Sequence, residues 1–251
     1  MIDIHTHILP HLDDGARESR ISEDMLKTEL SQGVKTVVFS PHFYGRRHSP
    51  AQFIERRNAA YEKLKARIPA GIDVRLGAEV HFTGVNVMEE EVFCSLAIQG
   101  TKYVLVELPF DSAWQGELLN RLSVLATDAG CTPIIAHVER YEEVLKNPGL
   151  VSTLVRNGCL IQVNSYAFLD KREKNFAFAL LKHGLIHCVG SDAHDMDGRK
   201  PNLAEAKAAV EKAGYAQEWQ TIQETMQKIL ADERVKIPAF TPVKKFLWWY
   251  L

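Results

Sequence analysis

The chain has 251 residues, of which 46% are hydrophobic and 25% are charged, and these proportions exclude a disordered or fibrous protein. Thirty Lys and Arg residues face 32 Asp and Glu residues, which gives a formal net charge of -2. This balance argues against nucleic acid as a partner, because such proteins usually carry a basic excess. The N-terminus lacks the basic and apolar stretches of a signal peptide, and no apolar run approaches the roughly 18 residues of a membrane span. We therefore expect a cytoplasmic protein.

Apolar, β-branched runs alternate with amphipathic segments along the chain. The runs predict strands at 1–5, 34–39, 73–80, 103–107, 132–137, 160–164 and 185–190. The intervening segments predict helices at 22–32, with Ser22 as N-cap, and at 50–68 after Ser49, and then at 85–96, 118–129, 138–157, 168–183 and 202–230. Such alternation is typical of a parallel sheet covered by helices.

Seven strand–helix units favour a (β/α) barrel over a doubly wound open sheet, although periodicity alone does not reveal whether the sheet closes. The units follow one another without a linker-like break. We therefore expect a single domain over residues 1–251 with a short aromatic and basic tail at 242–251.

The four cysteines are widely spaced and form no C-x-x-C pair, so the sequence predicts neither a zinc ribbon nor a disulfide framework. Cys131, Cys159 and Cys188 lie at or inside apolar runs. Reduced, buried thiols are expected there.

Histidine and carboxylate side chains recur where the predicted strands end, which is where β/α barrels place their chemistry. With one residue from the Asp13-Asp14-Gly15 loop, the candidate metal ligands are His5, His7, Asp14, His42, Glu79, Glu107, His137, Asp192 and His194. Side chains two apart on a strand share a face, so His5 and His7 can bind one ion, as can Asp192 and His194. The set exceeds what one ion binds and predicts two or three ions. Because it lacks cysteine, Mn²⁺, Fe²⁺ or Zn²⁺ is expected.

Each of these residues alone has an ordinary explanation. A lone strand-end glutamate is usually solvated, and a lone buried histidine is more often hydrogen-bonded within the core than bound to metal. Six strand ends that carry such groups by chance are improbable, and this conjunction favours the metal site. The other histidines are expected in loops, on the surface or in helices, with His11 and His81 as the candidates for contacts behind the ligands.

Two arginines, Arg140 and Arg199, lie just beyond predicted ligands. Guanidinium groups bind phosphate oxygens in a bidentate manner, so a multi-metal site between two arginines favours hydrolysis of a phosphate ester by an activated water. For each arginine, a surface ion pair is the alternative. Amide hydrolysis is a competing use of a metal barrel, but it gives the arginines less to do.

These motifs together resemble the PHP (polymerase and histidinol phosphatase) superfamily. The opening Ile2-Asp-Ile-His-Thr-His-Ile-Leu-Pro10, followed by Asp13-Asp-Gly-Ala16, is similar more specifically to the bacterial CpsB/YwqE-type protein-tyrosine phosphatases found with capsule and exopolysaccharide genes. The resemblance extends from Met1 to about Asp232. It implies a distorted (β/α)7 TIM-like barrel, a trinuclear manganese-type centre, and the tyrosine-phosphorylated tail of a membrane-associated bacterial tyrosine kinase as substrate.

The resemblance also implies how the ligands divide among three ions. The first ion would be held by His5, His7, Glu79 and Asp192. The second would use Glu79 as a bridge, with Glu107 and His137. The third would use Asp14, His42 and His194, with Asp13 as the alternative to Asp14.

Several residues indicate the branch of the superfamily and the reaction that the resemblance implies. Glu107 stands where many PHP phosphatases place a histidine, which favours the tyrosine-phosphatase branch over histidinol phosphatase. Arg140 and Arg199 match the phosphate-contacting arginines of that branch, and His137 and Asp192 join them as catalytic residues. The expected reaction is in-line attack on phosphorus by a metal-activated hydroxide.

A thiol nucleophile is excluded by the absence of the C-x5-R signature, because Gly100, His137, Ser165 and His194 stand six positions after the four cysteines. Two other functions stay open. One is a PHP phosphoesterase acting on a small metabolite such as histidinol phosphate. The other is a regulator that binds the kinase without catalysis.

The tail at 242–251 has two lysines followed by six aromatic or aliphatic residues. It can cover a groove of the barrel, or it can lie in the membrane interface, where Trp and Tyr favour the headgroup region and lysines favour anionic lipid. The second role would place the protein near a membrane-bound kinase.

Overall fold

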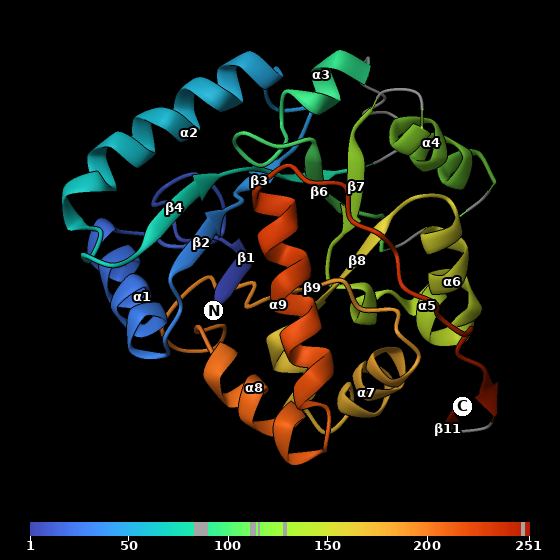
Figure 1. Ribbon diagram of the computed structural model, residues 1–251. Coiled ribbons are helices and arrows are strands. Elements are labelled where there is room, and N and C mark those ends of the chain that lie inside the picture. Colours follow the sequence, from blue (N-terminus) through green and yellow to red (C-terminus); the bar gives the residue numbers. More distant parts are fainter. Residues whose placement is uncertain (83–89, 111–113, 115, 128–129, 247–248) are drawn as a thin grey trace.

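The computed structural model describes residues 1–82, 90–110, 114, 116–127, 130–246 and 249–251. The chain has a mixed α/β fold in which parallel strands form a curled half-barrel sheet with helices around it (Figure 1). The strands of the half-barrel are β1 Ile2–Thr6, β2 Thr36–Phe39, β3 His42–Phe43, β4 Asp73–Leu76, β5 Glu79–His81, β6 Tyr103–Glu107, β7 Thr132–Ile135, β8 Leu160–Asn164 and β9 Cys188–Gly190.

The strands pair in two parallel sheets, in the orders β1-β2-β4 and β3-β5-β6-β7-β8-β9. The sheets meet where Thr6 bridges Ala193, and the His7 N–H donates to the Ala193 carbonyl over 2.9 Å. The first strand of the chain therefore lies beside the last strand of the half-barrel.

One predicted strand is interrupted, and another is followed by a short strand that was not predicted. The run predicted at 34–39 is followed after Ser40-Pro41 by the separate strand β3, and the run predicted at 73–80 divides at Gly77-Ala78 into β4 and β5. Pro41 has no N–H to donate to a neighbouring strand, which explains a break at that point. The interruptions place His42 and Glu79 opposite each other in the β3–β5 register.

The helices are α1 Ser19–Ser31, α2 Pro50–Leu64, α3 Glu90–Cys94, α4 Gly116–Thr127, α5 Glu142–Lys146, α6 Gly149–Arg156, α7 Lys174–Lys182, α8 Leu203–Lys212 and α9 Ala216–Leu230. Ser49 caps α2 as predicted, in a reciprocal capping box with Gln52. The prediction of Ser22 as an N-cap is wrong, because α1 begins three residues earlier and the Ser22 hydroxyl donates to the Glu18 carbonyl inside the first turn. The start of the helix predicted at 85–96 and the end of that at 118–129 lie outside the described residues.

Most residues of the buried strands are apolar, and most of the polar exceptions lie toward the carboxyl ends of the strands. All residues of β1, β6 and β8 are buried. Among them, His5, Glu107 and Gln162 are polar or charged. Burying such groups is costly unless they have partners, so the carboxyl ends of the strands are where a functional site is expected.

The cysteines differ in part from the prediction. Cys94, at the end of α3, forms a disulfide with Cys131, just before β7, across a Cα–Cα distance of 5.8 Å. The reduced state predicted for Cys131 is therefore wrong, because pairing of β6 with β7 brings together positions 37 apart in the chain. Cys159 and Cys188 are free and buried, as predicted.

The tail folds back onto the helices. Its strands β10 (Lys245–Phe246) and β11 (Trp249–Tyr250) pair antiparallel, and residues 247–248 lie outside the described residues. The Tyr250 ring lies 4.7 Å from the ring of Phe176 on α7, and the Lys245 ammonium donates to the Leu145 carbonyl over 2.7 Å. Among the described helices, none combines the length and the apolar character that crossing a bilayer requires.

Candidate metal centre

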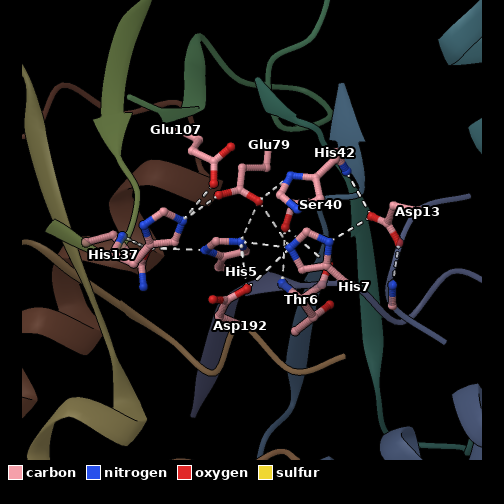
Figure 2. A network of polar contacts seen from close by, with 12 residues as sticks. His5, Thr6, His7, Asp13, Ser40, His42, Glu79, Glu107, His137 and Asp192 are labelled. Atoms are coloured by element: carbon pink, nitrogen blue, oxygen red, sulfur yellow. Dashed lines mark hydrogen bonds and ion pairs between the residues drawn. The ribbon is translucent and has the colours of Figure 1, made fainter. Parts of the chain in front are cut away.

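The structure brings all nine predicted ligand residues to the carboxyl ends of the strands. Figure 2 shows most of them pointing toward one another. Asp14 comes from the loop after β1, and its side chain is 65% exposed, whereas the other eight lie inside the site. The donor atoms form three groups, and the atoms within each group all lie within 4.8 Å of one another. The groups are His7-Asp14-His42-His194, His5-His7-Asp192 and His42-Glu79-Glu107.

Donor atoms of His5, His7, Glu79 and Asp192 have spacings like those in a coordination shell. The Nε2 atoms of His5 and His7 lie 3.0 Å apart, and they lie 3.3 and 3.2 Å from the Glu79 Oε2 atom. Each is 3.4 Å from the Asp192 Oδ1 atom. Four donors about 2.1 Å from one ion would be about 3.0–3.4 Å apart, depending on whether the geometry is octahedral or tetrahedral. His5, His7 and Asp192 therefore fit a single ion, and one Glu79 oxygen lies at a similar distance from both imidazoles.

Hydrogen bonds to the Nδ1 atoms of His5 and His7 orient the Nε2 lone pairs toward the centre of the cluster. The Nδ1 atom of His5 faces the Gln162 Oε1 atom at 3.2 Å, and that of His7 faces the Asp13 Oδ2 atom at 2.7 Å. Because an amide or carboxylate oxygen only accepts, the ring proton is on Nδ1 in both residues. Nε2 is then free to bind a cation.

The same contacts separate the two aspartates of the loop. Asp13 accepts hydrogen bonds from the His7 ring, from the His42 backbone N–H and from the Gly15 N–H. By contrast, the Asp14 Oδ1 atom lies 3.5 Å from His42 Nε2 and 3.6 Å from His194 Nε2. Asp13 thus orients other residues, and Asp14 faces the donor cluster.

Glu79 lies between the groups. Its Oε2 atom is 2.9 Å from His42 Nδ1, and its Oε1 atom is 2.8 Å from His137 Nε2. His137 Nε2 also lies 3.6 Å from the Glu107 Oε1 atom. The other Glu107 oxygen contacts His81 Nδ1 at 2.8 Å, so His81 is in contact behind a ligand, as predicted.

His194 completes the set. Its Nδ1–H donates to the Asp192 carbonyl over 2.8 Å, and its buried Nε2 atom has no hydrogen-bond partner within the described part of the chain. Its ring stacks on that of His7 at 3.9 Å. An unpartnered acceptor at such a position fits a metal ligand better than a structural histidine.

Electrostatics in the cluster favour cations. Burial disfavours the ionised carboxylates of Glu79 and Asp192, but the imidazoles around them, with His5 foremost, outweigh it and hold the pKa of each well below its usual range. Burial likewise disfavours a charged His5, but Glu79 and Asp192 raise its pKa. Burial and the neighbouring His7 lower the pKa of His194 to about 3. The carboxylates are thus held in their anionic form beside imidazoles that can exchange a proton for a metal ion, and together they form a site for positive ions.

Local backbone conformations shape the cluster. His137 and Asp192 adopt left-handed φ angles of 33° and 54°, which cost on the order of 1–2 kcal/mol each for non-glycine residues. Gly15 is required for close packing, because a Cβ there would lie 2.2 Å from the His7 carbonyl oxygen. Such strain at ligand positions is typical of a functional site.

The two arginines flank the cluster on one side. The Asp192 Oδ2 atom, which faces away from His5, accepts hydrogen bonds from Arg199 Nη2 over 2.6 Å and from Arg140 Nη1 over 3.3 Å. Both arginines line a cavity of about 450 Å³ together with Asn164 and Tyr166. Each arginine therefore forms an ion pair with a candidate ligand of the cluster.

Gln162 and Asn164 were not predicted as functional residues. The Gln162 Oε1 atom accepts from the His137 N–H over 2.7 Å, and its Nε2 donates to Asn164 Oδ1 over 2.9 Å. Asn164 Nδ2 donates to Asp192 Oδ2 over 2.9 Å. Two amides at alternate positions of an otherwise apolar strand were the signal, because such positions share one face.

Two histidines outside the ligand set differ in burial. His11 lies exposed in the loop after β1. His187 is buried, in contrast to the predicted loop, surface or helix position; its Nδ1 accepts from the Ile161 N–H, and burial lowers its pKa to about 4.

A cluster of imidazole and carboxylate donors at the carboxyl edge of a parallel sheet, flanked by two arginines, defines the class of metal-dependent enzymes. Residues 1–232 match the family model described as capsular polysaccharide synthesis, CpsB/CapC. The chain belongs to this family.

Named relatives cover nearly the whole chain. It is 32% identical over 253 residues to the tyrosine-protein phosphatase YwqE of Bacillus subtilis, covering 98% of this chain and 97% of that protein. It is 28% identical over 251 residues to the tyrosine-protein phosphatase CpsB of Streptococcus pneumoniae, covering 94% and 100%. A crystal structure from work on these two proteins, described as unique metal-dependent tyrosine phosphatases, superposes with a TM-score of 0.86 at 31% identity, over 98% of this chain and 100% of the other.

Proposed function

We propose that this protein is a metal-dependent protein-tyrosine phosphatase, a phosphomonoesterase that acts in capsular polysaccharide synthesis. The observation that carries the proposal is the pair of imidazole nitrogens of His5 and His7, which lie 3.0 Å apart and 3.2–3.4 Å from one oxygen of Glu79 and one of Asp192, a spacing that suits metal ligands. Membership of the CpsB/CapC family and the names of the relatives supply the reaction.

The donor chemistry supports three ions. The first ion is assigned to His5, His7, Glu79 and Asp192; the second to Glu79, Glu107 and His137; and the third to Asp14, His42 and His194. Glu79 is shared because each of its oxygens faces a different group. With nitrogen and oxygen donors and no thiolate, Mn²⁺ is the proposed metal, and Fe²⁺ and Zn²⁺ are the alternatives that this set accepts.

When bound, the ions would activate a water and neutralise the charge on the phosphoryl oxygens. Arg140 and Arg199 already point to this side through Asp192, and they are proposed to bind the phosphoryl oxygens and hold phosphorus in line with the attacking oxygen. The tyrosine leaving group has a pKa of about 10 in water, so it needs less proton donation than an alkyl alcohol.

The proposed substrate is a phosphotyrosine in a flexible protein segment, the tail of a bacterial tyrosine kinase. A cavity of about 450 Å³ lined by both arginines supports a substrate that enters from outside. The complete donor set weighs against the alternative of a regulator without activity. Hydrolysis of a small metabolite such as histidinol phosphate remains the competing reaction.

The decisive experiment compares turnover of a phosphotyrosine peptide with turnover of histidinol phosphate, with and without added Mn²⁺. We expect metal-dependent turnover of the peptide and slow turnover of histidinol phosphate. His137→Ala and Asp192→Ala should abolish turnover and leave the far-UV circular dichroism spectrum unchanged. Near-wild-type turnover in either variant, with unchanged metal content, would remove that residue from the proposed site.

We also infer that the whole chain is one (β/α)7 unit. Support comes from the bridge between Thr6 and Ala193, which joins the two sheets. In addition, β2 pairs with β4 and β3 pairs with β5. If β2 and β3 are counted as one bent strand, and β4 and β5 as another, the half-barrel has seven strands. Urea unfolding followed by fluorescence and by circular dichroism should then give one coincident transition. Two separate transitions would contradict a single unit.

The last element of the proposal is peripheral membrane contact through the tail at 242–251. Its basic and aromatic composition supports this role, although Tyr250 and Lys245 already contact Phe176 and Leu145. Co-sedimentation with anionic liposomes should be stronger for the full chain than for a chain that ends at Thr241. Equal binding by both would leave only the packing role.

A further inference from the structure

A second cavity borders the metal-ligand cluster and shares no lining residue with the cavity of Arg140 and Arg199. It has a volume of about 460 Å³, and Asp14 and His42 form its wall toward the cluster. The opposite wall comes from the segment between β3 and α2 and from the first two turns of α2. Its polar side chains are Tyr44, Arg47, His48 and Arg56. We call it the basic cavity.

The two arginines of the basic cavity share its lining with two carboxylates, Asp14 and Asp13, of which Asp13 is paired with His7. Arg47 lies over the Tyr44 ring, with 4.8 Å between its Cζ atom and the ring centroid, and Arg56 donates a hydrogen bond to His48 Nε2. Within the described part of the chain, neither guanidinium has a carboxylate at ion-pair distance, and both side chains are exposed. By contrast, Arg67 pairs with Glu23. The partners of Arg47 and Arg56 hold them in place and leave their charge available to a ligand.

The basic cavity adjoins the cavity of Arg140 and Arg199 at Asp14. Asp14 lines the basic cavity, and its Oδ2 atom lies 4.0 Å from Arg199 Nη1, which lines the other one. A peptide that places its phosphate between Arg140 and Arg199 can therefore continue past Asp14 into the basic cavity. A small phosphorylated metabolite would reach only one of the two.

We propose that the basic cavity binds an anionic side chain of the substrate peptide, at a position flanking the phosphotyrosine that is hydrolysed. The inference rests on the proposed function and adds a preference for acidic substrates. Guanidinium groups match carboxylate and phosphate oxygens, so the ligand is either an Asp or Glu residue or a second phosphotyrosine. Electrostatic attraction to this site would act on substrate binding and leave the chemical step unchanged.

The test uses three peptides of equal length, each with one hydrolysable phosphotyrosine. One has glutamates around it, one has glutamines, and one has a non-hydrolysable phosphonate analogue of a second phosphotyrosine. The Mn²⁺-loaded wild-type protein is compared with the double variant Arg47→Ala/Arg56→Ala. Arg46→Ala is the matched control, because Arg46 is exposed in the same segment and does not line the cavity. p-Nitrophenyl phosphate reports the basal activity of each protein.

In the wild type we expect KM to be about tenfold lower for at least one anionic peptide than for the glutamine peptide, the size of effect that one or two partly exposed charged contacts give. The double variant should lose this difference, and Arg46→Ala should keep it. All three proteins should hydrolyse p-nitrophenyl phosphate equally, which also shows that the variants fold. The peptide that gains more identifies whether a carboxylate or a phosphate is preferred.

Equal KM values for all three peptides in the wild type would overturn the inference and leave the phosphatase function standing. A loss in Arg46→Ala as large as in the double variant would also overturn it, because the effect would then be general surface charge. If the loaded wild-type protein hydrolysed neither p-nitrophenyl phosphate nor any peptide, the proposed function and this inference would both fail.

Discussion

Replacing Gln162 with leucine would remove the amide that connects three parts of the metal-ligand cluster. Its Oε1 atom accepts from the His137 N–H over 2.7 Å and faces the Nδ1 atom of His5 at 3.2 Å. Its Nε2 atom donates to Asn164, which in turn donates to Asp192. Leucine has a similar size and offers neither contact, so the side chain remains packed while the polar connections are lost.

The expected cost follows from the groups left without partners. The three groups left without partners are the His137 N–H, the His5 Nδ1–H and the side-chain Oδ1 atom of Asn164, and all three residues are buried. Each unsatisfied buried group costs about 1–3 kcal/mol. Because the 3.2 Å contact is the weakest, we expect the free energy of unfolding of the chelated protein to fall by about 3–6 kcal/mol. Loss of the group that orients His5 should also weaken Mn²⁺ binding about 10- to 100-fold.

Two measurements on the same variant check both numbers, urea unfolding of the chelated protein and titration with Mn²⁺ against a fluorescent chelator. Gln223→Leu is the matched control, because Gln223 accepts one hydrogen bond, from the Ile2 N–H, outside the site. It should cost about 1 kcal/mol and leave the Mn²⁺ affinity unchanged. If Gln162→Leu lost less than about 1 kcal/mol and bound Mn²⁺ as the wild type does, the reasoning about Gln162 would be refuted.

Three further outcomes are expected. Exhaustive chelation should abolish turnover and added Mn²⁺ should restore it, whereas thiol alkylation should have no effect, because Cys159 and Cys188 are buried and Cys94 is paired with Cys131; the reverse pattern would contradict a metal-dependent reaction. Arg199→Ala should lower kcat/KM by about 10- to 150-fold, the equivalent of about 1.5–3 kcal/mol for charged hydrogen bonds to phosphate, with the metal content unchanged; wild-type kinetics would return Arg199 to a surface ion pair. Burial raises the pKa of Glu139 to about 8. Between its ordinary pKa and this value, the folded chain keeps a proton that the unfolded chain releases, so the free energy of unfolding falls as the pH rises, by up to about 1.4 kcal/mol per pH unit. Glu139→Gln should therefore lose less stability than the wild type between about pH 5 and pH 8 in urea unfolding of the chelated proteins, and parallel losses would argue against it.

Periodicity and residue type predicted the main elements and the members of the candidate site. The strand-end positions of His5, Glu107 and His137 follow from apolar runs, because the same end of every parallel strand faces the same edge. The sequence predicted the end of β2 at Phe39, but it predicted neither the short strand β3 nor the break between β4 and β5, because burial continues through both segments. It also could not distinguish Asp13 from Asp14, because two neighbours in a loop have no periodicity, and only their hydrogen bonds separate them.

Other features depend on contacts between distant segments. The Cys94–Cys131 disulfide forms because β6 pairs with β7, and no local pattern encodes it. The roles of Gln162 and Asn164 depend on which side of β8 faces the cluster. The basic cavity escaped prediction because Arg47 and Arg56 belong to a loop and a helix whose meeting is a property of the folded chain.

The bridge between the first and last strands of the half-barrel sets when the site can form. The Asp3 carboxylate accepts a hydrogen bond from the Ser191 N–H over 2.9 Å, across 188 positions of the chain, and His7 donates to the Ala193 carbonyl. Contacts between such distant positions form late in folding, after the intervening segments have collapsed. A chain still emerging from the ribosome therefore holds His5 and His7 without Asp192 and His194. Substitutions far from the site that slow folding should then reduce the number of active molecules while leaving the turnover of each one unchanged.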